Sequence, residues 1–413
     1  MKKLISFALV LTLIFSLAAC GKSNSNVEVV KEYESQPLND DYQGEQKVAL
    51  SPNSVNNFCN GYAWIKRSDT SDNTIYSLID TSGKVIYSSS GSIYTHDMSN
   101  NACFIKESIG DDKYVYKIIN KEGKVTATSQ DGKFDAIYAS GDNLFFVYKY
   151  EGSIDASRHL YGTVNENGEF VNKLRECPYG QLSESFTKYV GAKTFLVGVG
   201  SYYVDPYIYM AGIDKYFGNN NIESDNPINI GNDLYIVNYG GVQAEGSDKI
   251  YSRYEEYECV KISADGKIEK APIFDSVVSG LLVNRDGDNV SFTDPTTGKT
   301  NVFSKYSVEA YNKADNNILL MLRGKDNNVY FTVIDKNCKI LFDPVMGKKA
   351  QANEGKVILE TANGHSVLDY SGNVLIAEGK YQSIETFNSG IAWAIDSSGN
   401  YVGIDEKGNI VIS

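Results

Sequence analysis

An all-β fold built from repeated short antiparallel sheets is predicted by three features of this 413-residue sequence. A phrase of one form recurs, as "YSLIDTSGKVI" from Tyr76, "HSVLDYSGNVLI" from His365 and "YVGIDEKGNIVI" from Tyr401. The composition, with 30 Tyr, 36 Gly and 8 Pro, fits strands separated by tight turns. Short apolar runs such as "YAWIK" precede the phrase. Together these features predict a β-propeller of about eight blades, with seven to nine compatible, each a short antiparallel sheet.

The recurring phrase predicts a β-hairpin turn. Its Asp or Asn can hydrogen-bond to its own downstream backbone, and the glycine three residues later can adopt the left-handed conformation that closes the loop. The Asp or Asn positions are Asp80, Asn120, Asp335, Asp369 and Asp405, and the turn glycines are Gly83, Gly123, Gly168, Gly266, Gly298, Gly372 and Gly408. Cys338 replaces the glycine in one copy, and a looser copy carries Gly218 one place late. The spacing wavers around a period of about 40 residues, which is typical of propeller blades.

Further strands are expected before each turn phrase. A central strand is predicted by runs such as "ACFIK", "NLFFVY", "TFLVGV", "DLYIVN", "ILLML" and "IAWAI", and a weaker strand before it by "FDAIYAS", "FDSVVS" and "YQSIETF". Two smaller sandwiches and an open solenoid are the competing architectures. The recurrence disfavours sandwiches, and the lack of obvious capping repeats disfavours an open solenoid.

The N-terminus predicts export. Lys2 and Lys3 precede an apolar run of 14 residues from Leu4 to Leu17, shorter than the roughly 20 residues that span a bilayer. The segment Leu17 to Cys20 resembles the lipobox of bacterial lipoproteins, which implies cleavage after residue 19 and diacylglyceryl modification of Cys20. Acyl chains on Cys20 would then tether the protein to the lipid bilayer. An uncleaved anchor and an ordinary signal peptide are the alternatives.

Three segments follow from this interpretation: a lipoprotein signal peptide at 1–19, a flexible polar tether at 20–47, and the propeller at 48–413. The formal net charge is −13, and it becomes −15 when Lys2 and Lys3 are removed with the signal peptide. So acidic a chain without a basic stripe disfavours a nucleic-acid partner. The expected partners are the bilayer, through Cys20, and a cell-envelope protein or glycan.

The two ends of the repeat region resemble WG-repeat proteins. "GYAWIKRSDTSDNTIYSLIDTSGKVI" and "GIAWAIDSSGNYVGIDEKGNIVI" place a small residue and a tryptophan, Trp64 or Trp393, before a strand and the closing phrase. In the middle of the chain Phe104, Phe145, Phe195 and Tyr235 roughly replace the tryptophan. The resemblance implies a repeat-built and non-enzymatic surface module.

Catalytic and metal-binding patterns are weak. His96, His159 and His365 stand in unrelated contexts, and there is no G-x-S-x-G sequence. Asp286 and Asp288 in "NRDGDN" suit a hairpin turn better than a calcium loop, and Glu255, Glu256 and Glu258 suit a solvated edge strand better than an acid and base pair. The sequence therefore predicts no catalytic residue, metal or cofactor.

The cysteines other than Cys20 also lack a motif. Cys59, Cys103, Cys177, Cys259 and Cys338 form an odd set without C-x-x-C spacing, which is typical of buried small apolar residues. Export would permit a disulfide, but the spacing does not determine any pairing.

One segment is unusually rich in tyrosine. "SYYVDPYIYM", Ser201 to Met210, contains the candidate ligand-binding residues Tyr202, Tyr203, Asp205 and Tyr207. Tyrosine combines a flat apolar face with a polar tip, which suits sugar rings and peptide chains. Packing between blades is the alternative explanation for these rings.

The sequence as a whole favours a non-enzymatic binding or scaffolding module, lipid-anchored on the outer face of the bacterial cytoplasmic membrane. The alternative is an exported glycan-active hydrolase or lyase built on the same propeller. A purely structural role in envelope assembly is a third hypothesis.

Overall fold

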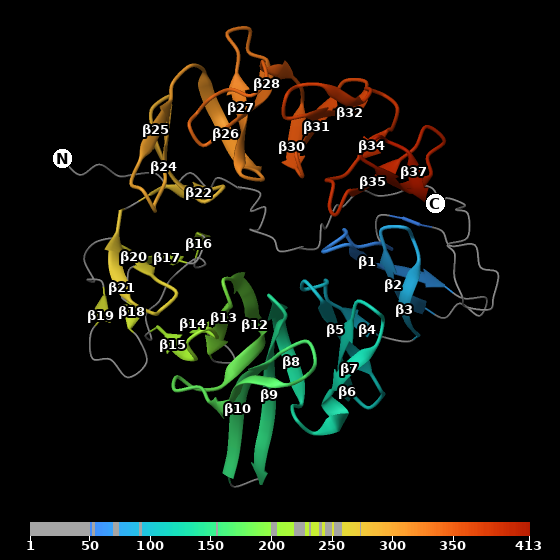
Figure 1. Cartoon of the computed structure of the whole chain (residues 1–413), viewed down its shortest axis with the longest axis vertical. Helices are drawn as coiled ribbons and strands as arrows, with labels where there is room; N and C mark the ends of the chain where they lie inside the picture. The colour runs from blue at the N-terminus through green and yellow to red at the C-terminus, as the bar shows by residue number, and fades with distance from the viewer. Residues whose placement is uncertain are drawn as a thin grey trace.

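The computed structural model is a ring of small antiparallel sheets, as Figure 1 shows. It describes residues 50–413 except 52–53, 69–73, 91–92, 154–155, 200–204, 219–227, 231–232, 239–241, 244–249, 252–257 and 273. For residues 68, 153, 156, 205–206 and those described between 228 and 259, it describes the backbone alone. The signal peptide, Cys20 and the tether lie outside the described residues.

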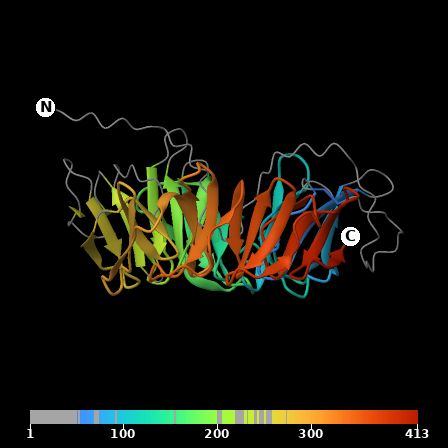
Figure 2. The same cartoon turned by 90° about the horizontal axis from the view of Figure 1, so that it is seen from above.

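Nine sheets form the blades of a β-propeller, which confirms the predicted fold class at the upper end of the expected blade number. In the described part of the chain, eight sheets have four strands and one has three. Figure 2 shows the ring from its side as a flat disc, with strands running across its thickness. Each blade is numbered here in chain order.

The strand bounds of the first five blades are as follows. Blade 1 contains β1 (Tyr62–Ser68), β2 (Thr74–Asp80) and β3 (Val85–Ser90). Blade 2 contains β4 (Ile93–Thr95), β5 (Ala102–Ser108), β6 (Tyr114–Asn120) and β7 (Val125–Thr128), followed by the 3-10 helix η1 (Ser129–Asp131). Blade 3 contains β8 (Ala136–Gly141), β9 (Leu144–Ser153), β10 (Ala156–Val164) and β11 (Phe170–Glu176). Blade 4 contains β12 (Leu182–Gly191), β13 (Thr194–Val199), β14 (Asp205–Met210) and β15 (Lys215–Phe217). Blade 5 contains β16 (Ile228–Ile230), β17 (Asp233–Asn238), β20 (Glu258–Ile262) and β21 (Ile268–Ala271), with a separate ribbon of β18 (Val242–Gln243) and β19 (Ile250–Tyr251) inserted between β17 and β20.

The remaining blades each contain four consecutive strands. Blade 6 contains β22 (Ser276–Val278), β23 (Leu281–Asp286), β24 (Asn289–Thr293) and β25 (Thr300–Phe303). Blade 7 contains β26 (Ser307–Ala314), β27 (Asn317–Arg323), β28 (Val329–Ile334) and β29 (Val345–Met346). Blade 8 contains β30 (Lys349–Asn353), β31 (Lys356–Thr361), β32 (Gly364–Asp369) and β33 (Val374–Ile376). Blade 9 contains β34 (Ser383–Ile384), β35 (Ile391–Ile395), β36 (Tyr401–Asp405) and β37 (Ile410–Ile412).

Blade 1 receives an inner segment from the residues before β1. Val55 bridges Ile65 in antiparallel fashion, and the Asn56 N–H donates to the Trp64 carbonyl at 2.8 Å. This segment occupies the place that a first strand takes in the other blades. Every blade is therefore built from one continuous stretch of chain.

The predicted turn phrase joins the third strand of a blade to its fourth. The Asp80 carboxylate accepts the N–H groups of Ser82 (2.8 Å) and Lys84 (3.1 Å), and Asp405 accepts those of Lys407 and Asn409 in the same way. The same pair of bonds is made by Asn120, Asn165, Asp335 and Asp369. The turn glycines have φ between +69° and +84°, and Cys338 takes φ +63° in their place. The predicted turn mechanism is confirmed.

Blade 4 departs from this pattern. Its corresponding turn runs between Met210 and Lys215, with Asp214 at φ +50°, and Gly218 follows β15 instead of closing the turn. The prediction that Gly218 marks the turn was wrong. This turn ends at Asp214, which takes the positive φ in place of a glycine. Asp286 and Asn289, by contrast, pair across the hairpin of β23 and β24 as expected for a turn.

Apolar side chains pack between neighbouring blades. Trp64 joins a cluster with Met98, Cys103 and Ile105 of blade 2, and Trp393 joins one with Phe58 and Ile65 of blade 1. Each indole N–H donates across the interface at 3.0 Å, from Trp64 to the His96 carbonyl and from Trp393 to the Asn56 carbonyl. The two tryptophans therefore have the same role at two blade interfaces.

The strand register corrects two of the residues expected at the tryptophan position. Trp64 pairs with Leu78, two places after the strand begins, and Phe104 pairs with Ile118 in the same way. In blades 3 and 4 the matching residues are Phe146 and Leu196. Phe145 and Phe195 lie one position away, and each packs against the preceding blade. A shift of one residue in a strand moves a side chain to the other face of the sheet, and the repeat pattern in the sequence does not define position to one residue.

The ring closes between blade 9 and blade 1 through side-chain packing and hydrogen bonds. Phe58 stacks on Trp393 with ring centroids 5.6 Å apart. The Gly61 N–H donates to Ser389 Oγ at 2.8 Å. Similar bonds link the turns between first and second strands in blades 7 to 9, because Asp315 accepts the Glu354 and Gly355 N–H groups and Glu354 accepts those of Ser389 and Gly390. No helix in the described part is long and apolar enough to cross a membrane.

Candidate functional site

A group of tyrosines around one lysine forms the most distinctive polar arrangement among the described residues. We call Tyr94, Lys106, Tyr114, Tyr116 and Glu184 the tyrosine–lysine cluster. Tyr94 of β4 pairs with Lys106 of β5, and Lys106 pairs with Tyr116 of β6, so these three side chains lie side by side on one face of blade 2. That face packs on blade 3, since Phe104 and Ile118 on it join the apolar cluster shared with blade 3.

The Lys106 ammonium is surrounded by aromatic rings. Its Nζ lies 4.6 Å from the Tyr114 ring centroid, 5.5 Å from that of Tyr116 and 5.9 Å from that of Tyr94. Each distance is within the range in which the negative face of an aromatic ring attracts a cation. The Tyr94 and Tyr114 rings are themselves 6.3 Å apart, which places them in contact.

Glu184 completes the cluster from blade 4. Its carboxylate lies 2.9 Å from Lys106 Nζ and accepts the Tyr116 hydroxyl at 3.0 Å. Glu184 is in a bulge of β12, because five steps from Ser183 to Lys188 match only two steps along β13. The extra residues project from the first strand of blade 4, and Thr187 Oγ1 closes the bulge by donating to the Ser183 carbonyl at 2.8 Å. Bulges of this kind often redirect a side chain near a functional site.

The cluster is open to solvent on one side. Tyr94 is 55% exposed, Tyr114 is 36% exposed, and Phe186 on the bulge is 54% exposed. The first residues of β4, β6 and β12 lie near the same face of the ring, because first and third strands both begin there in an alternating antiparallel sheet. Aromatic surface of this kind, with a converging ion pair, can bind a ligand that has both apolar faces and a charged group.

Two tyrosines near Glu184, the buried Tyr116 of the cluster and the partly buried Tyr138, have raised pKa values. Burial, and then the nearby Glu184 carboxylate, raises the pKa of Tyr116 well above its usual value. Burial also raises the pKa of Tyr138 of β8, with smaller contributions from Tyr161, Tyr148 and Glu184. These phenols therefore stay neutral and keep their O–H donors at any physiological pH.

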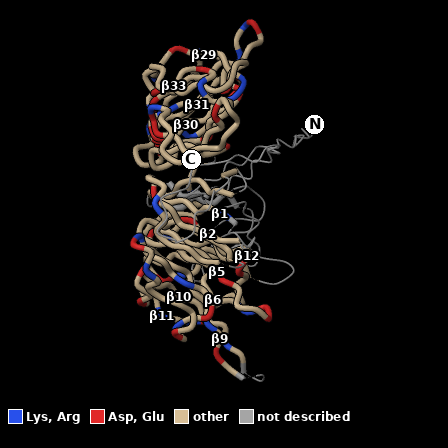
Figure 3. The backbone as a smooth tube through the Cα atoms, turned by 90° about the vertical axis from the view of Figure 1, so that its right-hand side faces the viewer, with Lys and Arg blue, Asp and Glu red and all other residues tan. Residues whose placement is uncertain are grey.

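A row of aromatic rings continues along the hairpin of β9 and β10, which extends beyond the neighbouring blades in Figures 1 and 3. Tyr138 stacks on Tyr148 at 5.5 Å, Tyr148 on His159 at 5.9 Å, and Tyr150 meets His159 edge-on at 5.7 Å. The Tyr148 hydroxyl and His159 Nδ1 are hydrogen-bonded at 3.0 Å. This row connects the interior of blade 3 with its surface.

The ligand-binding residues expected from the sequence are not brought together at this site. Tyr202 and Tyr203 lie outside the described residues, and only the backbone of Asp205, at the start of β14, is described. Tyr207 is 1% exposed and stacks on Tyr179 at 4.3 Å in the core shared by blades 3 and 4. Its ring therefore packs between blades and has no surface for direct ligand contact, although the hypothesis for the other three residues is untested.

The histidines and acidic residues considered in the sequence are also separated. His96 stacks on Phe104 in blade 2, and His159 lies on the blade 3 hairpin. His365 of blade 8 contacts the carbonyl of Gln382, which hydrogen-bonds to blade 9. Glu255 and Glu256 lie outside the described residues, and only the backbone of Glu258 is described. Within the described part, no group of three or more His, Cys, Asp or Glu side chains is placed to hold a metal ion.

Sequence reasoning missed the tyrosine–lysine cluster. Lys106 and Glu184 are 78 residues apart, and nothing in the local pattern "LSESFTKYVG" distinguishes a bulged strand from a regular one. The available signal was the tyrosine spacing in "DDKYVYKIIN", where Tyr114 and Tyr116 fall on one face of a strand.

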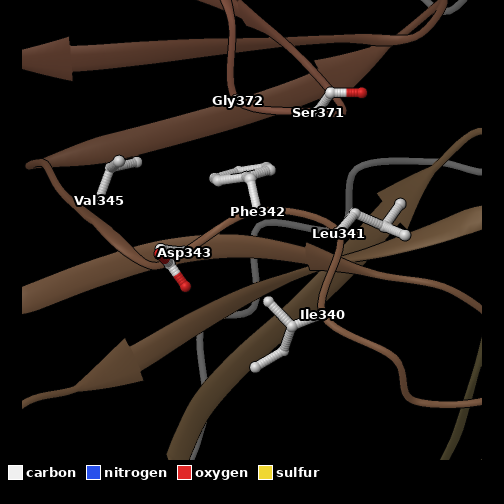
Figure 4. Close-up of a pocket in the computed structure, with 7 residues that line it drawn as sticks. All are labelled: Ile340, Leu341, Phe342, Asp343, Val345, Ser371 and Gly372. Carbon is white, nitrogen blue, oxygen red and sulfur yellow. The ribbon is translucent and has the colours of Figure 1, made fainter.

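A surface depression lies elsewhere, between blades 7 and 8 (Figure 4). Its volume is about 460 Å³, and it is lined by Ile340, Leu341, Phe342, Asp343, Val345, Ser371 and Gly372. Asp343 is the one charged side chain among these seven residues. Because polar groups do not converge on it, the depression is a weaker candidate than the tyrosine–lysine cluster.

Comparisons with known proteins give no family. No family model matches the chain, and no curated protein matches it. Among solved structures, an uncharacterized protein from Listeria monocytogenes is 9% identical with a TM-score of 0.34, covering 88% of this chain and 97% of that one. The Pan2 WD40 domain of Neurospora crassa is 11% identical with a TM-score of 0.26, covering 66% and 87%. TolB from Acinetobacter baumannii is 12% identical with a TM-score of 0.23, covering 67% and 77%.

Proposed function

We propose that this protein is a lipid-anchored binding module of the bacterial cell envelope, held on the outer face of the cytoplasmic membrane through acyl chains on Cys20. The apolar N-terminal run and the lipobox-like Leu17 to Cys20 support export and anchoring. The WG-repeat resemblance of the two chain ends supports a repeat-built, non-enzymatic module. Its ligand is a glycan or protein of the envelope.

The observation that carries the binding role is the tyrosine–lysine cluster. Exposed rings at Tyr94 and Tyr114 offer apolar faces, and the Glu184 carboxylate, paired with Lys106, offers a charged hydrogen-bond acceptor. A rigid scaffold of packed blades holds these groups in place, which reduces the entropy lost when a ligand binds. The same features do not constitute a nucleophile with its base, which is the arrangement that covalent hydrolysis requires.

Ligand binding is tested with purified protein comprising residues 21–413 on an array of cell-envelope glycans and by pull-down of envelope proteins. The Tyr94→Ala/Tyr114→Ala variant should lose at least tenfold in affinity, because it removes both exposed rings. The Phe170→Ala variant is the matched control, since Phe170 is an exposed aromatic residue on β11, an outer strand of blade 3. Equal affinity of the double variant and the control would contradict a binding site at the cluster.

The hydrolase or lyase alternative is tested in the same samples by following new reducing ends. Binding without release of reducing ends is expected, and release that depends on the protein would establish the enzyme instead. Anchoring is tested separately with Cys20→Ser in the full chain. The variant should no longer partition with membranes, and unchanged membrane attachment would refute lipidation at Cys20.

A further inference from the structure

We propose that the tyrosine–lysine cluster is a cage for an ammonium group, and that its ligand is a glycan carrying primary ammonium groups. In the ligand-free protein the Lys106 ammonium fills this cage as an internal competitor. This inference rests on the proposed binding function and specifies the chemistry of its ligand.

The geometry of the cage is that of a cation site. Three tyrosine rings lie 4.6, 5.5 and 5.9 Å from Lys106 Nζ, and the Glu184 carboxylate lies 2.9 Å from it. Aromatic faces attract organic ammonium groups, and a carboxylate beside them can accept a charge-assisted hydrogen bond from the same group. The position that Nζ occupies is therefore suited to the same group on a ligand.

The bulge in β12 is not accounted for by stability. It brings Glu184 from blade 4 to a lysine of blade 2, but the Glu184 side chain is 42% exposed and that of Lys106 is 21% exposed. Ion pairs at such exposed positions contribute little to stability. A strand irregularity that places a carboxylate against Lys106 and the Tyr116 hydroxyl is instead explained by recognition of a cation.

Access and charge favour a cationic glycan. Tyr94 and Tyr114 border the cage with exposed rings, and Phe186 is exposed on the bulge that carries Glu184. Exposed rings can pack against the apolar faces of sugar rings. The formal net charge of −13 attracts polycations and repels polyanions over distances longer than a direct contact. A ligand with repeated ammonium groups complements both features.

Displacement of Lys106 does not require the blade to open. Lys106 is fixed at its Cα in β5, and its long flexible side chain can withdraw toward solvent when a ligand ammonium enters. The lysine thus lowers the affinity of the wild-type protein by the fraction of time that it fills the cage.

The experiment measures binding of a glucosamine pentamer and of its N-acetylated counterpart to residues 21–413 by isothermal titration calorimetry. The wild type should bind the amine form at least tenfold more tightly than the acetylated form. Lys106→Met should bind the amine form about tenfold more tightly than the wild type, because the internal competitor is gone. Glu184→Gln should lose about tenfold, because the cage loses its negative charge.

The matched control is Glu176→Gln, which removes the acid of another exposed ion pair, with Arg158, on blade 3. This control should bind like the wild type, and thermal melting should verify that all variants are folded. If Glu184→Gln fails to fold, Tyr114→Leu provides the same test, because it removes a ring without changing charge.

Three outcomes would overturn the proposal in whole or in part. One is a Lys106→Met variant that binds the amine pentamer no more tightly than the wild type. Another is equal binding of the amine and acetylated pentamers, which would leave the binding function intact and refute only the ammonium specificity. The third is binding of a lysine-rich peptide but not of the amine pentamer, which would keep the ammonium cage and refute a glycan as its ligand. Loss of all glycan and protein binding would refute the proposed function as well.

Discussion

Two glycines with positive φ, each in a turn between third and fourth strands, allow the contribution of blade packing to be measured. Gly123 has φ +76° and Gly298 has φ +69°, so both adopt a conformation that disfavours a side chain. A Cβ at Gly123 would lie 2.1 Å from the Ile86 carbonyl oxygen of blade 1, whereas a Cβ at Gly298 would meet nothing within 4 Å. The two substitutions to alanine thus share the backbone cost and differ in the steric clash.

Gly298→Ala should cost about 1 kcal/mol, the penalty for placing an alanine in the left-handed region. Gly123→Ala should cost about 3–4 kcal/mol, because displacement of a packed backbone adds about 2–3 kcal/mol. Urea unfolding of residues 21–413, followed by tyrosine and tryptophan fluorescence and by circular dichroism, measures the difference in midpoint at constant slope. Equal costs for the two variants would refute the close packing of blades 1 and 2 at this turn.

Three further predictions concern stability and are measured by the same unfolding assay. Trp393→Phe should cost about 1–2 kcal/mol, because the Asn56 carbonyl at the ring closure loses its indole donor; no loss would contradict the role of that bond. Asp315→Ala should lower the free energy of unfolding by about 3 kcal/mol, because the Glu354 and Gly355 N–H groups and a tyrosine hydroxyl lose a charged acceptor. Asp315→Asn should lower it by less, and the opposite order would contradict this account. Burial raises the pKa of Glu385 despite the hydrogen bond from a tyrosine, so folding favours its protonated form. Wild-type stability should therefore fall as pH rises from the unfolded pKa of about 4.3 through the higher folded pKa. Glu385→Gln should lack this fall, and a pH profile of stability equal to that of the wild type would contradict the prediction.

The hairpin turns could be predicted from the sequence because their chemistry is local. An Asp or Asn that caps its own downstream N–H groups, followed by a residue with positive φ, needs no distant contact. Asp80 and Asp405 show this in the first and last blades. Cys338 was expected to replace the turn glycine and does so at φ +63°.

The blade number was harder to predict because three copies are irregular. Blade 1 takes its inner segment from residues before the recognisable repeat, blade 4 closes its turn without the usual glycine, and blade 5 is interrupted by the β18 and β19 ribbon. Each irregularity disturbs the period without changing the architecture. The uneven spacing of the turns therefore gave an estimate of about eight blades where the ring has nine.

The candidate site could not be predicted for a different reason. The high tyrosine content of one segment predicted a ligand-binding role for Tyr207, but the fold buries its ring against Tyr179. The tyrosine–lysine cluster, by contrast, combines residues of blade 2 with Glu184 of blade 4, and blade 3 lies between these two blades in the chain order. Which face a strand residue takes depends on register and on bulges, and these depend on contacts with distant strands.

The continuity of each blade has a consequence for how such a chain can change. No strand is exchanged between the first blade and the last, so the ring closes there by side-chain packing between two complete blades. Any other pair of neighbouring blades could therefore be the place where the chain begins and ends. A circular permutant that starts at blade 6 and joins the present ends would keep every sheet whole. Likewise, a tandem duplication of one repeat would supply a complete additional blade, so the circumference of the ring can grow without rethreading any part of it.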